Sequence, residues 1–118
     1  MGRIAKSLIS LNFMDDQLVL AKCAELIRKD FQLELQFDDE SENAGDRFHE
    51  IIEKMVRHLL DRDFQSLLNA LYRIDVSEQR IKEILATSPP DQIAEDIASL
   101  IIEREKQKVI TRMKYARR

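Results

Sequence analysis

Glycine and proline are scarce in this chain. Only Gly2, Gly45, Pro89 and Pro90 are of these types among 118 residues. Tight turns between strands use such residues heavily, so a sheet-rich fold would need more of them. Leu, Ile, Glu, Lys and Arg are common instead, and they favour helices. The sequence therefore predicts a mostly α fold, a compact bundle of about five helices forming a single domain over residues 1–118.

The single cysteine and the lack of long apolar runs limit where the protein can reside. One cysteine, Cys23, excludes an internal disulfide framework and favours a reducing compartment. No apolar run approaches the roughly 18 residues of a membrane span, and the first residues lack the apolar core of a secretory signal. We therefore expect a cytoplasmic protein that does not contact a membrane. Cys23 lies at helical spacing with Val19, Leu26 and Ile27, which predicts packing in the core.

The first apolar segment fits two different structures. Over residues 9–13 apolar and polar residues alternate, which favours a short strand. Ile4, Leu8 and Leu11 are instead spaced as one face of a helix. The sequence leaves strand and helix open here.

A helix and a strand-like segment follow. Asp15 or Asp16 is expected to cap a helix that runs to about Lys29, because an aspartate accepts hydrogen bonds from free backbone amides. Residues 31–37 then alternate strictly between apolar and polar, which is a strand pattern. A lone strand cannot satisfy its backbone groups. Three outcomes stay open: a possible minor two-stranded β element with residues 9–13, pairing with the same segment of a second chain, or continuation of the helix.

Two helices are expected in the middle of the chain. Over residues 46–60 apolar side chains recur every three or four positions, and Asp46 can cap this helix. If the helix were continuous, Phe64 would lie about 160° around the helix axis from Phe48, at about 100° per residue, and so on nearly the opposite face. A break near residues 61–63 keeps both apolar stripes on one core. We therefore predict a turn there and a second helix after it. The apolar face of this second helix, directed at the same core, consists of Phe64, Leu67, Leu68, Leu71 and Tyr72.

Two more helices are expected after residue 76. Ser77 is expected to cap a short helix that ends near Thr87. Ser88 followed by Pro89 is typical of a helix start, because serine caps and proline suits the first helical position. No breaker then occurs before Arg118. The last helix would span about 40 Å at about 1.5 Å per residue, so residues 104–118 are expected to project as a basic helix end.

Charge is distributed unevenly along the chain. The net charge is −3, but residues 30–63 carry eleven acids against four bases, and residues 103–118 carry seven bases against two acids. The basic end suits contact with another protein or with nucleic-acid phosphates, or it simply complements the helix dipole. The interaction surface that we predict there consists of Lys106, Lys108, Val109, Arg112, Met113 and Arg117.

No motif with catalytic chemistry is present. Two glycines 43 residues apart cannot form a phosphate-binding loop. His49 and His58, nine residues apart, would lie on opposite flanks of one helix and cannot share a metal. The acidic stretch over 38–46 has Asn43 where a calcium loop needs glycine. We therefore expect no catalytic residue, no cofactor and no metal site.

The leading hypothesis is a non-enzymatic protein–protein interaction or assembly module that forms a homodimer or binds another protein. It rests on the projecting last helix, the strand-like segment and the opposite charge blocks. One alternative is a nucleic-acid-associated accessory protein that uses the basic carboxyl-terminal helix. Another is a small-molecule or metal binder with a pocket between helices.

Overall fold

The computed structural model describes the backbone of residues 2–32 and 44–116 and the side chains of residues 17–32 and 44–115. The described residues form five helices and no strand, which confirms the mostly α prediction. The helices are α1 (Gly2–Phe31), α2 (Ala44–Arg62), α3 (Phe64–Ile74), α4 (Glu78–Thr87) and α5 (Ile93–Ala116).

The prediction of a minor β element was wrong for residues 9–13, which lie inside α1. The predicted helix start at Asp15 or Asp16 was also wrong, because α1 begins at Gly2 and continues through both aspartates. A helix satisfies its backbone groups within its own segment, whereas a strand needs a partner, so the helical spacing decided the outcome. Phe31 is the last residue of α1, and residues 33–37 lie outside the described part of the chain.

Capping aspartate and serine residues set two of the helix boundaries as predicted. α2 ends at Arg62, and Asp63 then caps α3 by accepting a hydrogen bond from the Ser66 amide at 3.2 Å. The break near residues 61–63 is therefore confirmed. Ser77 caps α4 by accepting a hydrogen bond from the Arg80 amide at 3.3 Å. Each cap satisfies an amide that would otherwise lack a partner at the start of its helix.

The predicted start of the last helix at Ser88–Pro89 was wrong. The Ser88 amide donates to the Ile84 carbonyl at 3.0 Å, so this serine ends α4. A turn follows, closed by the Gln92 amide donating to the Pro89 carbonyl at 2.8 Å, and α5 begins only after it. Pro90 explains why Pro89 is not helical, because a residue that precedes a proline is disfavoured in helical conformation.

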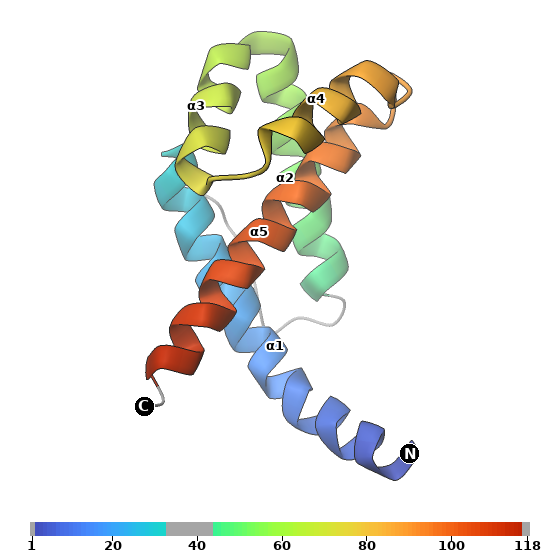
Figure 1. The fold of residues 1–118 in the computed structure, drawn as a ribbon, viewed down its shortest axis with the longest axis vertical. Coiled ribbons are helices and arrows are strands. Elements are labelled where there is room, and N and C mark those ends of the chain that lie inside the picture. The colour runs from blue at the N-terminus through green and yellow to red at the C-terminus, as the bar shows by residue number, and fades with distance from the viewer. Residues whose placement is uncertain (1, 33–43, 117–118) are drawn as a thin grey trace.

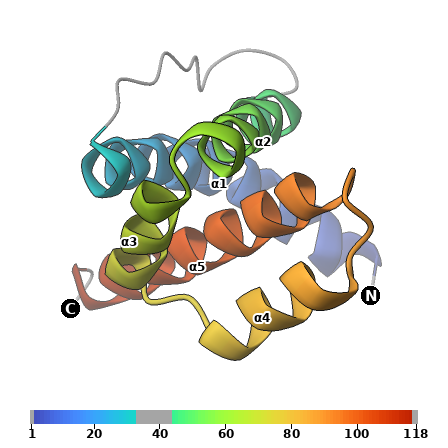
Figure 2. The same cartoon turned by 90° about the horizontal axis from the view of Figure 1, so that it is seen from above.

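α5 is the central helix of the fold, and it packs against each of the other four (Figure 1). In the view from above, α1 and α2 lie on one side of α5, and α4 lies on the other (Figure 2). α3 packs against α1, α2 and α5. Among the described helices, α4 packs closely only on α5, so α3 and α4 diverge from one another.

The buried apolar side chains form one cluster to which all five helices contribute. Its members include Cys23, Ile27, Phe48, Ile52, Val56, Leu67, Ile74, Ile81, Ile97 and Ile101. Cys23 is fully buried, which confirms that it packs in the core.

The first half of α1 extends past the other helices, toward the lower right of Figure 1. The radius of gyration is 15.4 Å, larger than the roughly 13 to 14 Å of a compact domain of this length. No helix in the described part of the chain is both long and apolar enough to cross a membrane.

Two phenylalanines allow a matched test of this core. Phe48 is buried in the cluster, whereas Phe64 is 42% exposed at the start of α3. Phe48→Ala is expected to lower the free energy of unfolding by about 3 to 5 kcal/mol, because it leaves a cavity in the core. Phe64→Ala should lower it by less than about 1 kcal/mol. Urea denaturation of both variants measures the difference, and equal losses would contradict this assignment of the core.

Candidate functional site

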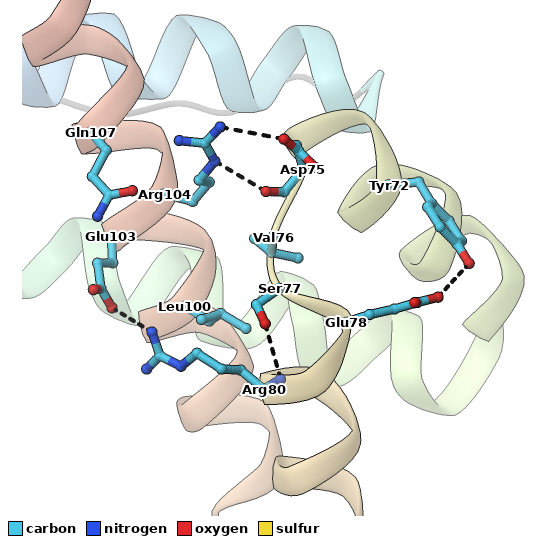
Figure 3. A pocket seen from close by; sticks show the side chains of 10 residues that line it. All are labelled: Tyr72, Asp75, Val76, Ser77, Glu78, Arg80, Leu100, Glu103, Arg104 and Gln107. Atoms are coloured by element: carbon cyan, nitrogen blue, oxygen red, sulfur yellow. Dashed lines mark hydrogen bonds and ion pairs between the residues drawn. The ribbon is translucent and has the colours of Figure 1, made fainter.

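A polar cleft of about 520 Å³ lies where the link between α3 and α4 meets α5 (Figure 3). Its walls come from three sequence regions: the end of α3 with the following link, the first turn of α4, and the middle of α5. The lining residues are Tyr72, Asp75, Val76, Ser77, Glu78, Arg80, Leu100, Glu103, Arg104 and Gln107.

The corner between α3 and α4 is fixed by Asp75. This residue has φ 65°, a left-handed conformation that aspartate tolerates better than most residues. Its amide donates to the carbonyls of Leu71 and Tyr72 and thereby ends α3. From α5, the Arg104 Nε donates to the Asp75 carbonyl at 3.1 Å, and a guanidinium nitrogen lies 3.6 Å from its carboxylate. Arg104 therefore anchors the corner to the central helix.

Two further polar pairs line the same cleft. The Tyr72 hydroxyl of α3 donates to the Glu78 carboxylate of α4 at 2.9 Å, so this bond spans the link between the two helices (Figure 3). This hydrogen bond, together with the negative charge of Glu78, raises the pKa of Tyr72. Arg80 lies 3.5 Å from Glu103 of α5. Both members of that pair are about half exposed, so it contributes little to stability.

An apolar groove of about 240 Å³ runs between α3 and α4 and continues from the cleft. We call it the α3–α4 groove. It is lined by Phe64, Leu68, Leu71, Tyr72, Val76, Glu78, Ile81, Lys82 and Leu85. The side chains of Phe64, Leu85 and Tyr72 are 42%, 40% and 69% exposed. Large apolar side chains gathered beside arginine and tyrosine are typical of protein-binding surfaces.

The interaction surface that was predicted on α5 is spread over different environments. Lys106 and Arg112 are exposed, and Lys108 and Met113 are half-buried. Val109 is buried in the core cluster, and Arg117 lies outside the described residues. The role of these six residues in binding stays a prediction.

Part of that predicted surface meets α1. Val109, Arg112 and Met113 line a shallow groove of about 220 Å³ with Lys22, Glu25 and Leu26 of α1. Two of the bases near the end of the chain also have acidic neighbours, because Arg104 lies beside Asp75 and Lys108 lies beside Glu105. These two cations are therefore engaged within the fold.

The histidines do not form a metal site in the described part of the chain. His49 is half-buried, and its Nε2 lies 2.9 Å from the Ser99 hydroxyl of α5. His58 is exposed further along α2. Among the described residues, no group of three or more His, Cys, Asp or Glu side chains is arranged to hold a metal ion.

Sequence reasoning missed the α3–α4 groove. Phe64, Leu67, Leu68, Leu71 and Tyr72 were expected to share one core-facing stripe, but only Leu67 and Leu71 are buried. A stripe this wide on a helix of 11 residues is the signal that could have revealed it. One core covers only part of such a stripe, and the remainder faces the groove.

Comparison with known proteins finds no matching family model, no matching curated protein and no matching solved structure.

The pair formed by Tyr72 and Glu78 gives a direct test of the cleft. Glu78→Gln removes the negative charge that disfavours the phenolate, so the pKa of Tyr72 is expected to fall toward its ordinary value. Ultraviolet absorbance of the phenolate during an alkaline titration measures this change. Tyr115→Phe in both proteins removes the signal of the other tyrosine. An unchanged titration of Tyr72 would contradict the contact.

Proposed function

We propose that this protein is a non-enzymatic assembly module that self-associates through the α3–α4 groove. The observation that carries this proposal is an open apolar groove between two helices, α3 and α4, whose backbones do not approach each other closely. A monomer leaves Phe64, Tyr72 and Leu85 exposed there. Each square ångström of apolar surface that an occupant removes from water contributes about 25 cal/mol. We also propose a cytoplasmic location, which the single buried cysteine supports.

The shape of the groove favours a helix as its occupant. Its walls are helices of 11 and 10 residues, so it is about 15 Å long at about 1.5 Å per residue. A helix of about three turns would match that length and would present apolar side chains at positions i, i+3 or i+4, and i+7. Glu78 and Lys82 on α4 provide one acid and one base at the rim, which suits a helix carrying both charges.

The occupant that we propose is the first half of α1 from a second copy of the chain. This half stands clear of the other described helices in Figure 1. Its sequence places Ile4, Leu8 and Leu11 at i, i+4 and i+7. One molecule therefore carries both a groove for a helix and a helix that extends beyond its own core. Reciprocal exchange about a two-fold axis would fill both grooves and close the assembly as a dimer.

Charge supports association between two copies. The acidic block over 30–63 and the basic block over 103–118 have opposite net charges within one chain. In a dimer, the acidic block of one copy can therefore lie opposite the basic block of the other. Such complementarity contributes to the orientation and rate of association more than to affinity.

The oligomeric mass tests this proposal. Light scattering of the full chain at micromolar concentration is expected to give about twice the monomer mass of 13.9 kDa. Leu85→Lys places a charge in the groove and should yield the monomer mass. Gln79→Lys adds the same charge on the same helix away from the groove lining and should remain a dimer. Circular dichroism checks that both variants stay helical.

Four results would contradict the proposal. A wild-type protein at the monomer mass would refute self-association, and a dimeric Leu85→Lys variant would exclude the groove. A dimer that survives deletion of residues 2–14 would exclude α1 as the occupant. Ile110→Lys, on the exposed face of α5, is expected to leave the dimer intact. A monomeric Ile110→Lys variant would indicate that the interface lies at the carboxyl-terminal end of α5 instead.

A further inference from the structure

An acidic side chain is completely buried where α1 crosses α5. Glu105 lies on α5 and is 0% exposed. Neither of its carboxyl oxygens makes a well-aligned hydrogen bond among the described residues, although Lys108 and Asp30 lie close enough to interact with it. The nearest cation is the Lys108 ammonium, 3.4 Å from Oε1 and one turn further along the same helix. A buried carboxylate with so little compensation destabilises the packing around it.

Titratable groups surround Glu105 on both helices. α1 contributes Cys23 and Asp30, and α5 contributes Lys108 together with Lys106, whose charge acts on Cys23. α3 contributes a cation next to Asp30, because Arg73 donates a hydrogen bond to the Asp30 backbone carbonyl at 2.8 Å. Glu105 therefore faces a second carboxyl group across the helix interface, with Lys108 as its ion-pair partner.

Burial raises the pKa of Glu105 to about 7. Lys108 opposes this rise by favouring the carboxylate, and the negative charge of Asp30 adds to the rise. Burial also raises the pKa of the Cys23 thiol to about 12, and the charge of Glu105 adds to that shift. The thiol therefore stays neutral near neutral pH, whereas Glu105 is close to half protonated.

We propose that Glu105 is a proton-controlled latch between α1 and α5. With a proton on Glu105, the carboxyl is neutral and the second half of α1 stays packed on α5 around Cys23 and Ile27. With the proton lost, a charge remains between the two helices and faces Asp30. The interface then opens more often, which gives the carboxylate access to water. This latch does not depend on the proposed dimer.

The sign of the pH dependence follows from the two values of the pKa. The closed form binds the proton with a pKa of about 7, and an opened form would bind it near the ordinary value of 4.5. The closed form therefore holds more protons between these values, and raising the pH through this window favours opening. The opening equilibrium should increase about tenfold between about pH 6 and about pH 8.

Hydrogen exchange at the amides of α1 tests the latch. After correction for the intrinsic rate at each pH, amides over residues 17–31 of the wild type should lose about tenfold protection from about pH 6 to about pH 8. Glu105→Gln cannot lose a proton at this position, so the protection of α1 in this variant should not change with pH. Glu50→Gln, at an exposed position on α2, is the matched control and should behave as the wild type.

Two further variants separate the latch from the dimer and from unfolding of the whole protein. Lys108→Met removes the cation that favours the carboxylate, so loss of protection should continue to higher pH than in the wild type. The monomeric background of Leu85→Lys should show the same pH dependence, which distinguishes failure of the dimer from failure of the latch. The proposal is overturned if Glu105→Gln keeps the wild-type pH dependence. It is also overturned if α2 loses protection in parallel with α1, because that pattern reports global unfolding.

Discussion

Burial of α5 against the other four helices is the constraint on which this fold depends. Ile97, Ala98 and Ile101 are fully or almost fully buried along its first half, and Val109 continues the contact toward α1. A central helix must be apolar around much of its circumference, and its sequence has no single polar face. Different parts of α5 meet different neighbours, so its apolar side chains are spread around its circumference.

Helix boundaries were predictable where one local signal acted alone. Ser77 caps a helix as expected, and the predicted turn near residues 61–63 ends at Asp63, which caps α3. In both caps a side-chain oxygen accepts from the amide three residues later, which is a strictly local arrangement. Ser88 carried the same signal but was overridden by Pro90, which acts on the conformation of the residue before it. The alternation over residues 9–13 was misleading, because five residues fit both periodicities and only longer-range pairing would have favoured a strand.

The candidate site was harder to predict than the fold. Periodicity identifies which residues of α3 are apolar, but it does not tell which of them the core will cover. Phe64 and Tyr72 were therefore assigned to the core although they face the groove. The burial of Glu105 is a second example. Its complete burial depends on where α1 crosses α5, and no local pattern specifies a crossing point.

The attachment of α4 to a single neighbour has a mechanical consequence. Among the described helices, α5 is the one whose backbone lies close to α4, and Ile81 is the one side chain of α4 that is buried. The two ends of α4 are tied to α5, because Arg104 donates to the Asp75 carbonyl and the Ser88 hydroxyl donates to the Asp96 carboxylate. Tyr72 of α3 also donates to Glu78 in the first turn of α4. The width of the α3–α4 groove is therefore set by these few polar contacts and by the packing of Ile81 and Ile84 on the core.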